Sequence, residues 1–262
     1  MVFNLLNLFN FQLNFLNSEA TKLLNDSPTM KTIAEGNTKV ILEAENPTQI
    51  VMRFKDTASA YHGIKRATIE GKGALANRIS ARLFGVLAEA GVENHFVGLL
   101  SDNEQLCLKT DVLPLRVIVR NVAAGSIVRR FGIEEGTEFR VPVYEMNYKS
   151  AQLDDPFLNE HTAVAFGFVS YDEMALISQT AHRANEVLIR FFDSCGIRLI
   201  DFKLEFGRTP DGRLILADEI SPDTCRLWDR MSGQRLDKDR FRRDMGDIIE
   251  AYREVWKRVC GE

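Results

Sequence analysis

Two acid-rich segments in the C-terminal third of the chain carry residue types that suit cation chemistry. Residues 201–207 read DFKLEFG, and residues 217–226 read ADEISPDTCR. Side chains alternate along a strand, so Asp201, Lys203 and Glu205 are expected to share one face of the first segment. Crowded like charges repel one another, so the acids need a compensating charge. The clustering therefore indicates either a solvated surface or a site that holds a cation.

The turn between the two segments decides which acid of the second strand approaches Glu205. The sequence TPDG at residues 209–212 fits two hairpin geometries. A two-residue loop places Asp218 opposite Lys203, whereas a bulged type I turn shifts the register by one residue and brings Glu219 round instead. In either register a second carboxylate lies within reach of Glu205. Two carboxylates beside a phosphate suit Mg²⁺, whose shell is completed by substrate oxygens and water.

A second candidate site is the segment RNVAAGS at residues 120–126, where a strand runs into a short predicted helix. Exposed N–H groups at a helix start, together with the hydroxyl of Ser126, suit an anion. Arg120 offers a two-pronged donor for a carboxylate or a phosphate. A plain turn with a helix cap explains the same pattern, so this segment alone does not decide between the two.

Two glycine-rich segments bear on nucleotide binding. EGKGALA at residues 70–76 matches GxGxxA, but the polar segment before it and the absence of further βαβ units argue against a dinucleotide fold. The chain contains no GxxxxGK[ST] sequence, which excludes a P-loop enzyme. EGNTK at residues 35–39 forms a predicted glycine hairpin with Lys39 beside it, and such hairpins can cover nucleotide phosphates.

Composition excludes several classes of protein. The net charge of −4 argues against nucleic acid as the main partner, because backbone binding needs a clustered positive surface. The four cysteines show no CxxC spacing, which indicates reduced thiols in a cytosolic protein and argues against structural zinc. No segment reaches the roughly 18 unbroken apolar residues of a membrane span. Residues 1–29 are expected to form a poorly ordered extension, with an amphipathic docking segment or an upstream start codon as alternatives.

The elements that position the candidate residues follow from hydrophobic periodicity and turn residues. Strands and helices alternate without a regular βαβ repeat, which predicts an α+β fold. Ser170 and Glu173 form a capping box for a long helix that ends at Gly196. Strands are predicted within residues 31–44, 49–63, 92–110, 113–120, 138–149 and 197–220, and further helices at 72–90, at 126–131 and from about 239 to the end.

Several of these segments together resemble the SAICAR synthetase family (phosphoribosylaminoimidazole-succinocarboxamide synthase). The resemblance lies in RNVAAGS, in DFKLEFG and in ADEISPDTCRLWD followed by DKDRFR. EGNTK, FKDTASA and EGKGALANRIS resemble the N-terminal blocks of the same family. The matching blocks run in order from about Met30 to the C-terminus, which makes the match far more specific than any one block.

The resemblance implies an ATP-dependent ligase of purine biosynthesis, the route to IMP. Such an enzyme joins carboxyaminoimidazole ribotide (CAIR) to L-aspartate and gives SAICAR, ADP and phosphate, with Mg²⁺ as the metal. It implies a two-lobed fold related to ATP-grasp enzymes, with an N-terminal lobe at residues 30–110, a C-terminal lobe at residues 111–262 and ATP bound between them. A cytoplasmic homo-oligomer without nucleic-acid or membrane partners is expected.

The resemblance also assigns roles to residues around the nucleotide. Gly36 and Lys39 lie in the hairpin that covers the ATP phosphates, and Glu205 belongs to the same site. Glu205 and Asp218 match the magnesium-binding carboxylates, with Lys203 between them near the transferred group. The family match prefers Asp218 over Glu219, and so it prefers the two-residue register of the hairpin.

The remaining roles concern the substrates. Asp201 and Asp223 lie in the same motifs and are expected to orient the catalytic site together with Lys203. Arg120 and Ser126 match the residues that hold the ribotide, and Arg226 and Arg242 are expected in the same substrate pocket.

Two positions depart from the family pattern. Asn37 stands where the family usually has a second lysine, and Arg116 stands where it usually has an acid. A small-molecule kinase would use the same lysines and carboxylates but pass phosphate to a hydroxyl, and a nucleotide-binding protein without catalysis is a third alternative. A requirement for aspartate distinguishes the ligase from the kinase.

Overall fold

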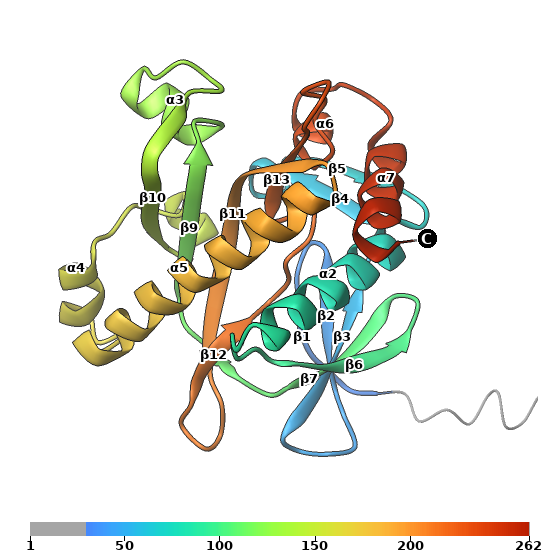
Figure 1. Ribbon diagram of the computed structural model, residues 1–262. Helices are drawn as coiled ribbons and strands as arrows, with labels where there is room; N and C mark the ends of the chain where they lie inside the picture. The colour runs from blue at the N-terminus through green and yellow to red at the C-terminus, as the bar shows by residue number, and fades with distance from the viewer. Residues whose placement is uncertain (1–29, 262) are drawn as a thin grey trace, which may run out of the picture. The chain divides into compact units, whose positions relative to one another are not determined.

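The computed structural model describes residues 30–261 of the 262-residue chain. Residues 1–29, for which the sequence predicts a poorly ordered extension, lie outside the described residues. From Thr32 onward the chain forms one unit. This unit mixes antiparallel sheets with helices, so the predicted α+β fold is confirmed (Figure 1).

The first sheet is antiparallel and has the order β1–β2–β3–β7–β6. One of its faces packs against helix α2 (Lys72–Glu89), where Met52, Phe54 and Cys107 meet Ala76. The predicted hairpin and the predicted helix that follows it are both confirmed. The strands of this sheet are β1 (Thr32–Glu35), β2 (Lys39–Glu43), β3 (Gln49–Phe54), β6 (Phe96–Ser101) and β7 (Glu104–Leu108).

The second sheet is built around the long strand β11. Its order is β10–β9–β11–β12, and β8 and β13 also pair with β11. Val119 and Phe202 of this sheet pack with Leu188 and Phe192 of helix α5 in the main hydrophobic core. The strands are β8 (Asp111–Val112), β9 (Leu115–Val122), β10 (Glu138–Tyr148), β11 (Ile197–Arg208), β12 (Leu214–Ala217) and β13 (Cys225–Asp229).

Helices pack against the two sheets. The capping box predicted for α5 forms, since Glu173 N donates to Ser170 Oγ at 3.1 Å and Ser170 N donates to Glu173 Oε2 at 2.8 Å. In Figure 1, α5 crosses the second sheet and α2 lies beside α7, which it contacts. The remaining helices are α3 (Ser126–Phe131), α4 (Glu160–Ala165), α5 (Tyr171–Ser194), α6 (Asp239–Arg242) and α7 (Ile248–Cys260); the short ribbon β4 (Thr57–Ala60) and β5 (Lys65–Thr68) and the 3₁₀ turns Tyr61–Gly63 and Ala151–Leu153 complete the described chain.

The prediction of one continuous closing helix is wrong. The chain forms α6, breaks, and resumes as α7. Asp244, Gly246 and Asp247 in the break have φ angles of +55°, +71° and +47°. Left-handed backbone cannot continue a right-handed helix, so the helix must end there. The break leaves α6 free to carry its own charged residues toward β13.

The two sheets use separate stretches of the chain. Strands of the first sheet lie between residues 32 and 108, and strands of the second lie between 111 and 229. Helix α2, which follows β5, and helix α7, the last helix of the described chain, pack against each other. The division into lobes at residues 30–110 and 111–262 stays a prediction.

Candidate active site

The middle of β11 places three charged side chains on one face. Phe202 and Leu204 are buried in the main core. Asp201, Lys203 and Glu205 alternate with them and therefore lie on the opposite face of the sheet. This is the arrangement that the sequence predicts.

Five charged residues from three parts of the chain meet beside this face. We call them the lysine–carboxylate cluster. Lys203 Nζ donates to Glu205 Oε1 at 2.7 Å and to Asp218 Oδ2 at 2.9 Å. Lys39 from β2 also donates to Asp218, and its Nζ lies 2.8 Å from Glu219 Oε1. Each carboxylate of the cluster is thus neutralised by at least one lysine.

The hairpin between β11 and β12 takes the bulged form. Gly212 is left-handed with φ +87°, and Glu205 pairs with Ala217. This pairing is shifted by one residue from the two-residue register, so the preference for that register is wrong. Asp218 still reaches Lys203 because its own φ of +66° bends the chain directly after β12. Both acids that the two registers offered, Asp218 and Glu219, therefore enter the cluster.

Lys39, Lys203 and Asp218 stay ionised at neutral pH. Burial alone would lower the pKa of Lys39, but the charges of Asp218 and Glu219 outweigh burial and raise it above its ordinary value. Burial acts in the same direction on Lys203, and Asp218 and Glu205 again outweigh it and raise the pKa. Burial would raise the pKa of Asp218, yet Lys203 and Lys39 hold it well below the usual range. The lysines are therefore cations and not bases.

The donor set fits a divalent cation as a partial shell. Within residues 30–261 no group of three or more His, Cys, Asp or Glu side chains is arranged to hold a metal ion. Glu205 and Asp218 face a common point, where the ammonium group of Lys203 bonds to both. A magnesium ion held by these two carboxylates would take its other ligands from substrate oxygens and water, as Mg²⁺ commonly does.

Arg120 is the hub of a second charged group, which adjoins the first along β11. Its guanidinium donates from Nη1 to Asp201 Oδ2 at 2.6 Å and from Nε to Glu145 Oε2 at 2.8 Å. Nη2 donates to Ser126 Oγ at 3.0 Å. Arg120 is 2% exposed. It therefore fixes Ser126 and Asp201 in place, while more exposed groups face solvent.

Arg226 and Arg242 are those more exposed groups. Arg226 donates to Asp201 Oδ2 at 2.7 Å and to Asp239 Oδ2 at 2.9 Å. Arg242 bonds to the other oxygen of Asp239, and its side chain is 29% exposed. Gly125 allows this packing, because a Cβ there would lie 2.3 Å from Nη2 of Arg226. The glycine of RNVAAGS thus permits close approach of an arginine.

Asp223 is buried and contacts other side chains of the protein. Its side chain is 4% exposed, and it bonds to Lys72 at the start of α2. Lys238 Nζ lies 3.3 Å from Asp223 Oδ1, and Tyr252 Oη donates to the same oxygen at 3.2 Å. Ser221 connects this site to the lysine–carboxylate cluster, since its Oγ accepts from Asp223 N at 3.0 Å and donates to Glu219 Oε2 at 2.5 Å.

The glycine hairpin lies next to the cluster through its second strand. Gly36 N donates to Lys39 O at 2.9 Å, which closes the turn. Lys55 Nζ donates to Gly36 O at 2.9 Å and to Glu35 Oε1 at 2.7 Å. Lys55 follows β3 and so adds a second lysine near the position of Asn37.

Several site residues escape analysis of the sequence. Lys149 bonds to Glu205, and the buried His95 holds the backbone oxygen of Asp218 through Nε2 at 3.0 Å. Burial lowers the pKa of His95 to about 4, so its ring is neutral. Lys72 could have been suspected from its place in EGKGALA, at a helix start. The other residues have no local motif, because their partners are distant in the chain.

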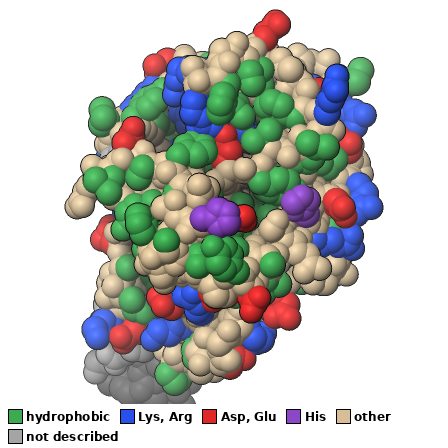
Figure 2. Space-filling model, turned by 90° about the vertical axis from the view of Figure 1, so that its left-hand side faces the viewer, with side chains coloured by type: hydrophobic (Ala, Val, Ile, Leu, Met, Phe, Trp, Pro, Cys, Tyr) green, Lys and Arg blue, Asp and Glu red, His purple; other side chains and the backbone are tan. Residues whose placement is uncertain are grey.

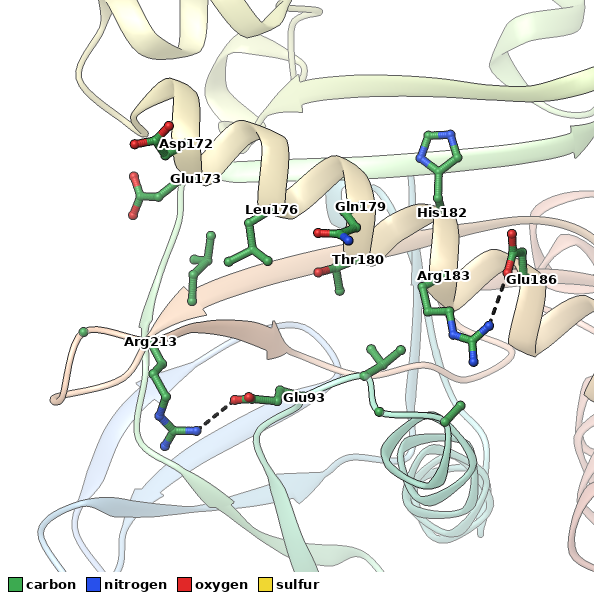
Figure 3. A pocket seen from close by; sticks show the side chains of 15 residues that line it. Glu93, Asp172, Glu173, Leu176, Gln179, Thr180, His182, Arg183, Glu186 and Arg213 are labelled. Atoms are coloured by element: carbon green, nitrogen blue, oxygen red, sulfur yellow. Dashed lines mark hydrogen bonds and ion pairs between the residues drawn. The ribbon is translucent and has the colours of Figure 1, made fainter.

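A large cavity lies away from these residues. It measures about 1000 Å³ and lies between α5 and the loop that follows α2 (Figure 3). Two ion pairs lie in its lining, Arg213 with Glu93 and Arg183 with Glu186. None of the residues predicted for the site lines this cavity.

Comparison with known sequences decides the family. The family model for SAICAR synthetase matches residues 32–259, a range that includes every predicted site residue. The chain belongs to the SAICAR synthetase family. A phosphoribosylaminoimidazole-succinocarboxamide synthase of Clostridium acetobutylicum is 50% identical over 228 residues, which cover 87% of this chain and 97% of the relative. The Clostridium botulinum enzyme of the same name is 48% identical and covers 86% and 96%.

Solved structures of this family have the same fold. The synthase from Ehrlichia chaffeensis superposes with a TM-score of 0.86 at 42% identity, covering 87% of this chain and 98% of the other. A SAICAR synthetase solved in complex with ADP gives a TM-score of 0.85 at 44% identity and covers 87% and 97%. These likenesses confirm the predicted family and its fold.

Proposed function

We infer that the chain catalyses the ATP-dependent ligation of CAIR with L-aspartate, giving SAICAR, ADP and phosphate in purine biosynthesis. The observation that carries this function is the family match over residues 32–259. A relative that is 44% identical binds ADP in its solved structure, which supports ATP as the nucleotide. The lysine–carboxylate cluster supplies the charges that such a reaction needs.

The chemistry runs in two steps. A carboxylate is a poor electrophile, so the γ-phosphoryl group of ATP first passes to the CAIR carboxylate and gives an acyl phosphate and ADP. The aspartate amine then attacks the acyl carbon, loses a proton, and phosphate leaves with the bonding electrons. The first step needs neutralisation of charge on the phosphoryl oxygens. The second needs a nucleophile held against the carbonyl group while water is excluded.

We assign the phosphate side of the reaction to the lysine–carboxylate cluster. Lys39 and Lys203 remain protonated, so each offers positive charge to phosphate oxygens and accepts no proton. Gly36 lies in the hairpin beside them. A magnesium ion held by Glu205 and Asp218 would neutralise further phosphate charge when bound.

We assign the ribotide and its orientation to the arginine side. Arg226 and Arg242 present guanidinium groups that can fork onto a phosphate or a carboxylate. Arg120 acts on the ribotide through Ser126, whose hydroxyl it holds at 3.0 Å. Asp201 orients both Arg120 and Arg226, since one of its oxygens accepts from each.

Asp223 has a positioning role in this proposal. It anchors the loop that carries Glu219 and Ser221 to the start of α2 through Lys72. A buried carboxylate with two cationic partners keeps its charge, and burial is outweighed by Lys238 and Lys72 so that its pKa falls below the usual range. Asp223 therefore shapes the site without touching substrate.

The placement of ATP and of the protein in the cell belongs to the same proposal. ATP binds between lobes formed by residues 30–110 and 111–262, since Lys39 comes from the first and the carboxylates from the second. The cysteines Cys107, Cys195, Cys225 and Cys260 are free, which supports a cytoplasmic location. Among the helices of residues 30–261, none is long and apolar enough to cross a membrane.

We propose a homo-oligomer that uses the face formed by α3, β10 and α4. Figure 2 shows the left-hand side of Figure 1, where apolar side chains lie between charged ones. Exposed apolar residues include Phe131 on α3, Val141 on β10 and Phe157 in the segment before α4, which are 64%, 73% and 50% exposed. Light scattering of the purified chain tests this, and a monomer at micromolar concentration would contradict it.

Analysis of the product tests the ligase function. The purified chain is incubated with Mg-ATP, CAIR and ¹⁵N-labelled L-aspartate, and the product is examined by mass spectrometry. The expected product is SAICAR with the label in its amide nitrogen. An unlabelled product that carries one phosphoryl group more than CAIR would indicate the kinase instead. No product from a folded protein that binds ADP would contradict both.

A further inference from the structure

Glu205 contacts more cationic side chains than the neutralisation of one carboxylate requires. Its side chain is 2% exposed. Oε1 accepts from Lys203 at 2.7 Å, and Oε2 accepts from Lys149 at 2.5 Å. Arg116 Nε lies 3.5 Å from Oε1. Three cations therefore surround a carboxylate at the point where a divalent cation is proposed to bind.

Arg116 is held rigidly in this position. It lies on β9, where its neighbour Val117 pairs with Leu204 of β11, so the strand register places it beside Glu205. Its guanidinium forms an ion pair with Asp155, which anchors the end of the side chain. Nε is buried and donates no hydrogen bond. Its charge therefore stays beside Glu205 whether or not a ligand is bound.

Lys149 differs from Arg116 in its freedom to move. Its side chain is 38% exposed, and its contact with Glu205 is a single ion pair. A lysine on a flexible stem can leave a carboxylate when another cation arrives. Arg116 cannot leave without breaking its pair with Asp155.

The linked ion pairs balance in charge. Among the described pairs that connect to Glu205, the same number of cations and carboxylates take part. The cations are Lys39, Lys149, Lys203 and Arg116, and the carboxylates are Asp155, Glu205, Asp218 and Glu219. A divalent cation that enters alone would thus add uncompensated positive charge to a buried neutral cluster, which is unfavourable.

We propose that Arg116 makes divalent-cation binding at Glu205 depend on an anionic ligand bound at the same time. The phosphate groups of a nucleotide bring the negative charge that the balanced cluster lacks, so metal and nucleotide bind together and the metal alone binds weakly. The inference rests on the proposed function for the identity of the nucleotide and of the metal-binding carboxylate. The coupling between metal binding and nucleotide binding depends on charge, so it can be measured without turnover.

Binding of Mn²⁺ tests the proposal without catalysis. Free Mn²⁺ is followed by its electron paramagnetic resonance signal during titration of the protein, first alone and then with saturating ADP, with a correction for Mn²⁺ bound to free ADP. Wild type is expected to bind Mn²⁺ weakly alone and tightly with ADP. Arg116→Gln removes one positive charge, so Mn²⁺ alone is expected to bind about tenfold more tightly. The increase in Mn²⁺ affinity that ADP produces is expected to fall by the same factor.

Two further variants separate charge from structure. Arg116→Lys keeps the charge on a more flexible side chain, so it is expected to bind Mn²⁺ alone more weakly than Arg116→Gln does. Arg213→Gln removes an arginine that pairs with Glu93 in the distant cavity, and it is expected to change nothing. Circular dichroism and thermal unfolding confirm that each variant is folded.

The outcomes are distinct from those of the ligase assay. An unchanged Mn²⁺ affinity in folded Arg116→Gln, or a loss of affinity, overturns the proposal. Absence of Mn²⁺ binding in every variant even with ADP overturns it too. If the chain makes no SAICAR but shows the predicted coupling, the proposal stands while the assigned reaction fails.

Discussion

Glu205 shows how a single residue connects the fold to the chemistry. The strand alternation that buries Phe202 and Leu204 also turns Glu205 toward Lys203. Burial would raise the pKa of Glu205, but Lys203 and Lys149 outweigh burial and lower it. The carboxylate therefore remains charged and available to a cation.

Replacing Glu205 tests its role directly. Glu205→Gln keeps the shape of the side chain but removes the charge that would hold the metal beside the phosphates. We expect kcat to fall by at least about a hundredfold, because the charge stabilises the transition state. Steady-state kinetics at saturating Mg-ATP measures this fall.

The control for this variant is Glu93→Gln. Glu93 is exposed and pairs with Arg213 away from the cluster. Glu93→Gln should leave kcat unchanged, and circular dichroism should show that both variants are folded. Activity of Glu205→Gln within about threefold of wild type would exclude Glu205 as a metal ligand.

Asp237 is expected to make the stability of the protein depend on pH. Burial, together with the charge of Asp239, raises the pKa of Asp237 to about 7 from an ordinary value of 3.8. Between about pH 4 and pH 7 the folded state therefore holds a proton that the unfolded chain has released. The folded state binds more protons in this window, so the free energy of unfolding should fall as pH rises through it.

Asp237→Asn should remove this slope. Urea unfolding of wild type and variant at several values between pH 4.5 and pH 7.5 measures it, these limits spanning roughly the window set by the two pKa values. A constant offset between the two proteins is expected from the altered hydrogen bonds to Leu227 N and Asp239 N. Parallel profiles of wild type and variant would show that Asp237 does not hold the proton.

At the scale of single residues the sequence predicts the charges on β11 but not their partners. Asp201, Lys203 and Glu205 are found by alternation, which is local. Lys149 bonds to Glu205 across 56 positions, and Lys72 bonds to Asp223 across 151 positions. Pairs that are so distant in the chain depend on the tertiary fold, so no local pattern contains them.

Among the elements, the turn into α3 matters most for the arginine side of the site. Gly125 has φ +68°, and Arg226 packs where a side chain would stand. The helix it precedes ends at Gly132, as the sequence predicts, with φ +66°. The two glycines share a positive φ, but they differ in what surrounds them.

This difference gives a matched pair of variants. Gly132→Ala meets no atom within 4 Å, so it should cost only backbone strain of about 1–2 kcal/mol in the free energy of unfolding. Gly125→Ala adds a clash with Arg226 and should also raise the KM for CAIR about tenfold. Thermal unfolding and substrate titration measure the two effects. An equal KM in both variants would contradict the role of Arg226 in holding the ribotide.

Predictions about elements fail where the backbone turns left-handed without a glycine. Asp218 escapes the register argument because its φ of +66° ends β12 and redirects the chain. Asp244 and Asp247 interrupt a helix whose apolar spacing continues across the break. Helices with clear caps, such as α5 with Ser170, are predicted correctly because the cap is itself a local pattern.

At the scale of the whole molecule, two groups of charges share the polar face of one sheet. The lysine–carboxylate cluster joins β2 to β11 and to the chain after β12. The arginine group joins β9, β11, β13 and α6. Their common support on β11 places the proposed phosphate side and ribotide side next to each other, as transfer of a phosphoryl group to CAIR requires.

The dependence of ADP release on each substrate tests the central claim most directly. Purified protein is assayed with Mg-ATP, CAIR and L-aspartate, and then with each one left out in turn. A ligase predicts sustained ADP release only when all three are present, since the acyl phosphate turns over through the aspartate amine. Sustained ADP release at the same rate without aspartate would contradict the ligase and favour a kinase.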